Sequence, residues 1–218
     1  MKVERFVLGP FGTNTYVVSD DDGKVLLIDP ACSNEYERQQ LYNYISNLKS
    51  QISYPFGTIV SNFKLSIVAT HGHLDHLWGA RWATETWGVP VLMHEADIPM
   101  AKAMQQQYDL FGIRATAEPF LIEPLNEDKF SIFNFQLSII ETPGHTPGSI
   151  CLYFPNSLSP SILISGDTLF QMGYGRTDLP GGNMGQLIDS LERLFELPAD
   201  TVVYPGHGDF TTIGAERR

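Results

Sequence analysis

Four times along this chain, a short apolar run ends in a turn that carries histidine or aspartate. Short runs rich in β-branched residues and bounded by turn residues are typical of buried strands. Side chains delivered from the ends of several strands converge at one edge of a sheet, where loop residues commonly carry function. The turns lie at residues 70–76, 142–149, 165–168 and 205–208. The chain is therefore expected to fold so that these four turns meet.

The first turn is the richest in side chains that can bind metal. It holds His71, His73, Asp75 and His76 within six residues, while the whole chain has only six histidines. Neutral imidazole and ionised carboxylate suit Zn²⁺, Fe or Mn. In an extended turn His71 and His73 point the same way, whereas Asp75 and His76 begin a helix and point toward a second position. The spacing indicates metal binding rather than histidines scattered in a polar loop.

Each later turn adds one candidate ligand, His145, Asp167 or His207, beside glycine residues that allow close approach of the backbone. Alone, His145 or His207 would more often be a surface histidine, but as parts of the set both are predicted to bind metal. His94 also follows an apolar run. It lacks the glycine-rich turn and a paired ligand, so we predict a capping or packing role for it.

The remaining pattern predicts strands that alternate with helices, and therefore a layered α/β domain. The residues Asp20-Asp21-Asp22-Gly23 predict a hairpin turn, and Asn34 with Glu37 predicts a capping box at a helix start. Further helices are expected over 75–87 and 95–107, with Pro99 limiting the start of the second, and through residues 187–195. Strands are expected at 15–18, 25–28, 65–69, 91–93, 137–140, 150–154, 162–164 and 202–204.

Composition narrows the classes of protein that this chain can represent. The hydrophobic fraction is 43%, the charged fraction 18% and the formal net charge −11, which indicates a globular protein without the basic stripe of a nucleic-acid binder. No segment is long and apolar enough to span a bilayer. The two cysteines, Cys32 and Cys151, are expected to be buried thiols. We predict one cytoplasmic domain over residues 1–218, with neither nucleic-acid nor membrane partners and an oligomeric state left open.

Four motifs carry a family resemblance: HxHxDH at 71–76, TPGHTPGS at 142–149, SGDTLF at 165–170 and YPGHGDFTTIG at 204–214. Together they resemble the metallo-β-lactamase superfamily, and within it the glyoxalase II-like (hydroxyacylglutathione hydrolase-like) branch. The resemblance implies a four-layer αββα sandwich with a metal site at one edge. It also implies which residues bind each ion: His71, His73 and His145 bind the first metal, Asp75, His76 and His207 bind the second, and Asp167 bridges both.

The same resemblance implies a hydrolase with two divalent metal ions, with Zn favoured and Fe or Mn possible. Two cations sharing one water would provide a bridging hydroxide at neutral pH. The expected substrate is a small acyl thioester such as a hydroxyacylglutathione, and Asp75 and Asp167 are the expected catalytic carboxylates. Full-length glyoxalase II adds a C-terminal helical domain that holds glutathione. This chain is expected to lack that domain, which leaves a smaller or different thioester open.

Three alternatives remain at this point. One is a persulfide dioxygenase with a single iron, a class that carries a stretch similar to Gly175-Arg176-Thr177-Asp178. A second is a hydrolase of another ester or lactone, and the third is a non-catalytic scaffold. Flavodiiron reductases place Glu where His73 stands, and true β-lactamases lack a carboxylate like Asp167. Arg176 either binds a substrate carboxylate or pairs with Asp178, and Tyr174 is a weak candidate for the pocket wall.

Overall fold

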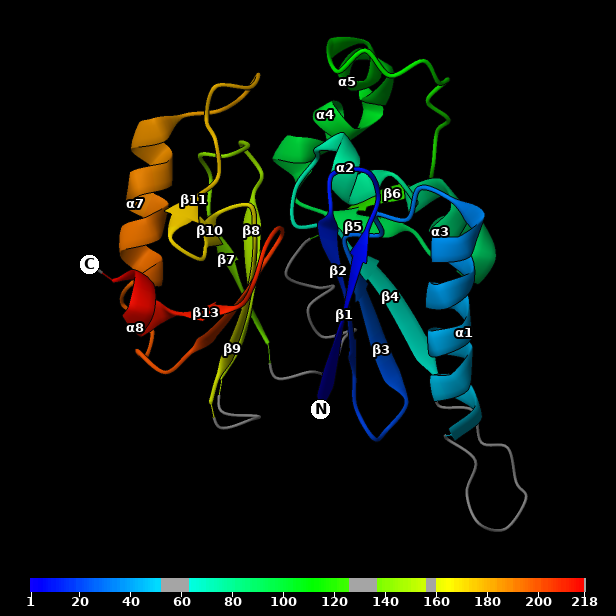
Figure 1. The fold of residues 1–218 in the computed structure, drawn as a ribbon, viewed down its shortest axis with the longest axis horizontal. Helices are drawn as coiled ribbons and strands as arrows, with labels where there is room; N and C mark the ends of the chain where they lie inside the picture. Colours follow the sequence, from blue (N-terminus) through cyan, green and yellow to red (C-terminus); the bar gives the residue numbers. More distant parts are fainter. Residues whose placement is uncertain (52–62, 126–136, 156–159, 218) are drawn as a thin grey trace.

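The fold is taken from a computed structural model that describes residues 1–51, 63–125, 137–155 and 160–217. In these residues, two large β-sheets face each other and helices cover both outer faces (Figure 1). The four-layer αββα sandwich that the family resemblance implied is therefore confirmed. No helix in the described ranges combines the length and apolar character needed to cross a bilayer.

The first sheet has the strand order β1-β2-β3-β4-β5-β6. Its first three strands are antiparallel, and β4 to β6 continue it in parallel. The predicted hairpin joins β2 to β3, where Asp20 accepts hydrogen bonds from the backbone N–H groups of Asp22 and Lys24. The strands are β1 (Lys2–Leu8), β2 (Thr13–Ser19), β3 (Lys24–Ile28), β4 (Lys64–Val68), β5 (Val91–Met93) and β6 (Ile122–Pro124).

The second sheet has the order β13-β12-β9-β8-β7, in which only the β12–β9 pair is parallel. A short hairpin of β10 and β11 follows β9. These strands are β7 (Ser138–Glu141), β8 (Ile150–Phe154), β9 (Ile162–Gly166), β10 (Leu169–Phe170), β11 (Gly173–Tyr174), β12 (Val202–Pro205) and β13 (Thr211–Thr212). Every predicted strand is present within a residue or two of its predicted bounds.

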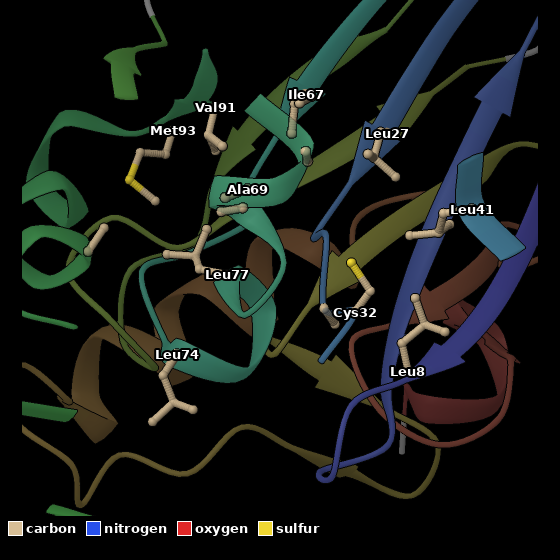
Figure 2. Packing of buried hydrophobic residues seen from close by; sticks show 14 of the residues in the cluster. Leu8, Leu27, Cys32, Leu41, Ile67, Ala69, Leu74, Leu77, Val91 and Met93 are labelled. Atoms are coloured by element: carbon tan, nitrogen blue, oxygen red, sulfur yellow. The ribbon is translucent and has the colours of Figure 1, made fainter. Parts of the chain in front are cut away.

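Three apolar layers hold the sandwich together. Residues such as Tyr16, Ile28, Leu152 and Ile164 fill the space between the sheets. A larger cluster lies under the helices that cover the first sheet, and Figure 2 shows Leu27, Ile67 and Leu77 among its side chains. A third cluster packs α7 (Met184–Leu194) and α8 (Ile213–Glu216) on the second sheet. Both cysteines are buried and free, as predicted.

Helix α1 (Glu35–Gln51) begins at the predicted capping residues, with one difference. The side chain of Asn34 accepts a hydrogen bond from the Glu37 N–H at 3.0 Å, as in a capping box. The Glu37 carboxylate, however, accepts from the N–H groups of Ser33 and Gly9 rather than reaching back to Asn34. Glu37 therefore also ties the start of α1 to the turn after β1.

The two long helices predicted over 75–87 and 95–107 are each divided. The first is split into α2 (Leu74–Leu77) and α3 (Ala80–Trp87). Gly79 lies between them against the backbone after β3, where its N–H donates to Pro30 O and a Cβ would meet Cys32 O at 2.9 Å. The second is split into a 3₁₀ turn, η1 (Glu95–Asp97), followed by α4 (Ile98–Lys102) and α5 (Met104–Leu110). At the first break, contacts with the turn after β3 thus override the helical periodicity, and Pro99 stands in the first turn of α4.

Candidate metal centre

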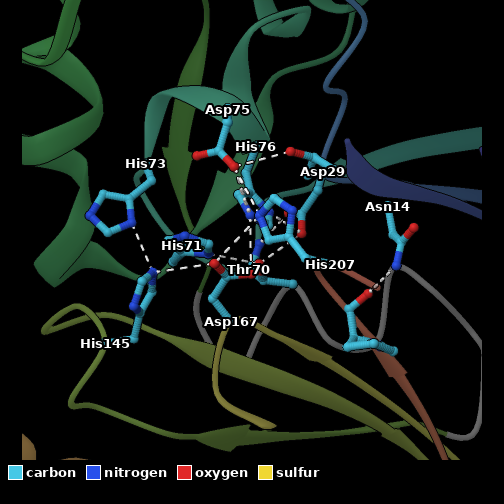
Figure 3. A network of polar contacts seen from close by, with 12 residues as sticks. Asn14, Asp29, Thr70, His71, His73, Asp75, His76, His145, Asp167 and His207 are labelled. Atoms are coloured by element: carbon cyan, nitrogen blue, oxygen red, sulfur yellow. Dashed lines mark hydrogen bonds and ion pairs between the residues drawn. The ribbon is translucent and has the colours of Figure 1, made fainter. Parts of the chain in front are cut away.

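The seven predicted ligands lie together where the strands of both sheets end (Figure 3). The turn after β4 carries His71 and His73, and α2 carries Asp75 and His76. The second sheet contributes His145 before β8, Asp167 directly after β9 and His207 after β12. The four turns therefore meet at one edge of the sandwich, as the apolar runs predicted.

The first group consists of His71, His73 and His145, all buried, with ligand atoms within 4.8 Å of one another. His73 Nδ1 lies 2.9 Å from His145 Nε2, so only one of these two nitrogens can carry a proton in the space between them. Three imidazole nitrogens aimed at one point make a set that suits a transition-metal ion.

The second group consists of Asp75, His76 and His207. Asp75 Oδ2 lies 3.0 Å from His207 Nε2 and 3.5 Å from His76 Nε2. The same oxygen accepts a hydrogen bond from the Thr13 hydroxyl at 3.0 Å, which fixes the carboxylate against β2. Unlike the first group, this one combines imidazole with a carboxylate.

Asp167 lies between the two groups. One of its oxygens is 3.2 Å from His76 Nε2, and the other is 3.6 Å from both His145 Nε2 and His207 Nε2. His71, His76 and Asp167 also form a ligand set of their own. Asp167 is thus within reach of ligands from both groups, the position that the bridging role requires.

Two observations test whether metal ions fit this site. His71 Nε2 is buried and has no hydrogen-bond partner among the described residues, while the buried His76 Nε2 and Asp167 Oδ1 lie 3.2 Å apart without the geometry of a hydrogen bond. Buried polar atoms in proteins nearly always have a partner, so an ion that accepts the His71 electron pair and lies between the other two atoms would explain this arrangement. In addition, a Cβ on Gly206 would lie 2.1 Å from Asp167 Oδ1 and 2.7 Å from His76 Cε1. Glycine keeps this space open, and the donor set fits Zn, Fe or Mn.

The histidine nitrogens that face away from the site are held by protein acceptors. His145 Nδ1 donates to the carbonyl oxygen of Arg176 at 2.7 Å. His71 Nδ1 donates to the Thr70 hydroxyl at 3.0 Å, and that hydroxyl donates in turn to Asp29. When the proton is held on Nδ1, the electron pair of Nε2 is free to bind a metal. These contacts therefore select the tautomer that can act as a ligand.

Asp29 is a site residue that sequence reasoning did not identify. Its carboxylate accepts from the N–H and hydroxyl groups of Thr70 at 2.7 and 2.8 Å and from His76 Nδ1 at 2.9 Å. The residue is buried and has a φ of +52°, a left-handed conformation that aspartate and asparagine tolerate better than most residues. The signal in the sequence was an acidic residue directly after the strand at 25–28.

The Asp29→Asn variant tests this contact, because asparagine keeps the shape and tolerates the same φ. Its NH₂ group must replace either Oδ1, which accepts from the Thr70 N–H, or Oδ2, which accepts from the Thr70 hydroxyl and His76 Nδ1, so at least one hydrogen bond is lost. We expect metal affinity to fall about 10- to 100-fold, as for other residues that orient a metal ligand. Metal titration of the purified variant measures this. Wild-type affinity in a folded variant would show that Asp29 does not orient His76.

Asp97 was also missed. It is fully buried, and its carboxylate accepts from the N–H groups of Gly72 and Gly148 at 2.7 and 2.6 Å and from the Thr146 hydroxyl at 2.7 Å. It therefore connects the turn that carries His71 and His73 with the turn that carries His145. Gln107 supports the first of these turns, since its amide accepts from Leu74 N and donates to Gly72 O.

His94 lies outside the cluster. Its Nδ1 accepts from the Ala96 N–H at the start of η1, and its Nε2 lies 3.3 Å from Glu141. This is the capping contact that we predicted.

The His94→Ala variant should therefore keep the wild-type metal content. The loss of this cap should cost about 0.5–2 kcal/mol of stability at most. Elemental analysis of the metal-loaded variant is the measurement, with thermal unfolding as a control for folding. Loss of one metal equivalent would mean that His94 belongs to the metal centre.

The electrostatic environment differs between the two groups. Burial and the neighbouring imidazoles lower the pKa of His71 well below its usual range and that of His73 to about 4, so both are neutral at pH 7. Burial opposes protonation of His76 as well, but the carboxylates of Asp75, Asp167 and Asp29 raise its pKa well above the usual range. Without metal His76 holds a proton, and metal binding at the second group is therefore expected to release it.

The two candidates for substrate contact lie at the wall of a cavity of about 390 Å³ that five of the seven predicted ligands also line: His73, Asp75, His145, Asp167 and His207. Tyr174 is 52% exposed there. The Arg176 guanidinium forms two hydrogen bonds with Asp178, from Nε at 2.6 Å and from Nη2 at 2.7 Å. The internal pair is thus formed, whereas the substrate role of either residue stays a prediction.

Comparison with known proteins is consistent with this geometry. A family model described as the metallo-beta-lactamase superfamily matches residues 8–207. The chain is 36% identical over 222 residues to a probable metallo-hydrolase, YqgX, of Bacillus subtilis, covering 100% of this chain and 95% of that protein. It is 32% identical over 225 residues to the hydroxyacylglutathione hydrolase GloC of Haemophilus influenzae, covering 100% and 96%.

Solved structures show the same fold. The crystal structure of TTHA1623 in a di-iron-bound form has a TM-score of 0.78 and 31% identity, with 99% of this chain and 97% of that chain covered. The crystal structure of the B3 metallo-beta-lactamase BLEG-1 has a TM-score of 0.80 and 31% identity, with 99% and 96% covered. Similar chains thus bear the names of different hydrolases.

Proposed function

This chain belongs to the metallo-beta-lactamase superfamily, and we propose that it is a two-metal hydrolase that cleaves a small acyl thioester. The observation that carries the proposal is the position of Asp167, whose two oxygens lie within 3.6 Å of ligand nitrogens from both groups. A non-catalytic scaffold has no need for an open cluster of this kind. The name of the GloC relative supports a thioester, and a hydroxyacylglutathione is the first compound to test.

The residues of the chain fit the chemistry of acyl transfer to water. Bound metal ions would supply an activated water and a Lewis acid for the acyl oxygen. His71, His73 and His145 would hold one ion, Asp75, His76 and His207 the other, and Asp167 both. Thr13 holds one oxygen of Asp75, which lines the cavity and is the carboxylate that we propose to orient the attacking water.

The test combines metal content with turnover on a panel of substrates. Protein loaded separately with Zn, Fe or Mn is analysed for metal per chain and assayed with S-lactoylglutathione and with a neutral thioester, S-acetyl-N-acetylcysteamine. We expect two metals per chain and thioester hydrolysis that a chelator abolishes and added metal restores.

Other outcomes would replace the proposal. One iron per chain with oxygen consumption on glutathione persulfide would identify a dioxygenase. Turnover of a β-lactam, a lactone or an oxygen ester without thioester turnover would identify a different hydrolase. Metal binding without turnover of any of these compounds would favour the scaffold.

A further inference from the structure

A second cavity, of about 200 Å³, opens beside His73. Its wall comes from α4, α5 and the segment before α7, which lie at the same end of the molecule (Figure 1). None of the described residues that line it is Lys, Arg, Asp or Glu. The apolar side chains of this wall are Met100, Ala103, Leu110, Phe111, Leu179 and Pro180. The cavity is therefore suited to an uncharged apolar group.

The polar atoms at this wall are already engaged or face solvent. Gln107 accepts from Leu74 N at 2.9 Å and donates to Gly72 O and Met100 O at 3.0 and 3.1 Å, so both ends of its amide are used within the protein. Gln106 is exposed. A charged group placed in this cavity would lose its hydration without gaining a partner from Gln107, which is costly.

The apolar cavity adjoins the cavity at the predicted metal ligands. His73, Phe111 and Leu179 line both this cavity and the 390 Å³ cavity at the predicted ligands. A substrate whose scissile carbonyl lies at the metal positions can therefore extend a neighbouring group past His73. Pockets for whole drug-sized ligands measure about 300–1,000 Å³, so the smaller cavity has room for one short group.

The charges around the cleft disfavour a glutathione-like substrate. Among the described residues that line the two cavities, Arg176 is the one Arg or Lys side chain. Its guanidinium is bound at both Nε and Nη2 by Asp178, and this pairing lowers the pKa of Asp178 to about 2. The carboxylates of glutathione would thus find no unpaired arginine or lysine at this wall.

We propose that the cavity beside His73 binds a short alkyl group of the substrate, and that the preferred substrates are uncharged thioesters carrying such a group. This inference rests on the proposed thioester hydrolysis and names its substrate class. The alkyl group can belong to the acyl side or to the thiol side of the scissile bond, and the two arms of the experiment separate these cases.

The experiment measures kcat/KM of the metal-loaded protein for two series of thioesters. The first varies the acyl chain of N-acetylcysteamine thioesters from acetyl to butyryl to hexanoyl, and the second varies the thiol of acetyl thioesters from ethanethiol to butanethiol. Each buried CH₂ group contributes about 0.8 kcal/mol, which corresponds to about fourfold. We expect a rise of about 15-fold for two added CH₂ groups in one series, and a lower value for S-lactoylglutathione.

Two variants and one control connect the preference to the cavity. Ala103→Leu fills it and should lower the ratio of kcat/KM for hexanoyl over acetyl by more than about tenfold, the loss of roughly two buried CH₂ groups. Ala215→Leu, at an exposed position in α8 outside both cavities, is the matched control and should keep the wild-type ratio. Leu110→Lys, at a position 60% exposed, should instead raise the ratio for succinyl over butyryl thioesters.

A binding measurement keeps the inference testable if no thioester is hydrolysed. Titration of the metal-loaded protein with hexanoate and with acetate should show tighter binding of hexanoate, and Ala103→Leu should remove that difference. Absence of turnover with a retained preference for hexanoate would reject thioester hydrolysis but keep the alkyl site. Turnover or binding that is indifferent to chain length, or a highest kcat/KM for S-lactoylglutathione, would reject the alkyl site itself.

Discussion

Replacing Asp167 with alanine is expected to lower metal occupancy at both positions and to reduce kcat/KM by more than about 100-fold. Residues that only orient a metal ligand already cost about 10- to 100-fold when they are changed, and Asp167 lies within 3.2 to 3.6 Å of ligand nitrogens from both groups. Its removal also takes away a carboxylate that would compensate the charge of the bound metal ions. Metal per chain and thioester turnover are measured together.

The neighbouring Asp209→Ala variant is the control for this experiment. Asp209 follows His207 by two residues, but its side chain is 78% exposed and pairs with Arg5, so its loss should change neither metal content nor rate. If Asp167→Ala keeps two metals and the full rate, the bridging assignment is wrong. Loss of one metal alone would place Asp167 in a single position.

Replacing Asp97 with alanine should have the largest effect on stability. The change leaves the buried N–H groups of Gly72 and Gly148 without an acceptor, and each such group costs about 1–3 kcal/mol. We expect a loss of about 3 kcal/mol or more, which for a chain of this size corresponds to a fall in melting temperature of about 6–12 °C. Metal affinity should fall with it, because the turns carrying His73 and His145 are no longer tied together.

Thermal unfolding of the metal-free protein separates the two effects. Asp22→Ala, at a side chain 79% exposed, is the matched control and should stay within about 0.5 kcal/mol of the wild type. Asp97→Asn, which keeps one acceptor oxygen, should fall between the alanine variant and the wild type. A wild-type melting temperature for Asp97→Ala would show that the connection between the turns contributes nothing to stability.

Sequence patterns predicted the strands and identified the seven candidate ligands. Both predictions rest on short stretches of sequence, each of which can be interpreted without knowing the rest of the fold. An apolar run followed by a glycine-rich turn shows where a strand ends. The spacing of the residues from His71 to His76 indicates which of their side chains can reach the same metal position. Asp29, Asp97 and Gln107 were not found, because their partners lie 25 to 51 residues away in the chain and become neighbours only after the sheets pack. The break at Gly79 has the same origin, since its contacts come from Pro30 and Cys32.

The cluster lies across the boundary between the two sheets, and this has a consequence for the whole chain. Residues 71–76 are attached to the first sheet, whereas His145, Asp167 and His207 belong to the second. An ion held by both sets acts as a reversible cross-link that the unfolded chain cannot form. By mass action, a metal present at 100 times its dissociation constant would add about 2.7 kcal/mol to the free energy of unfolding. The melting temperature of this protein should therefore rise with the concentration of free metal, independently of any substrate.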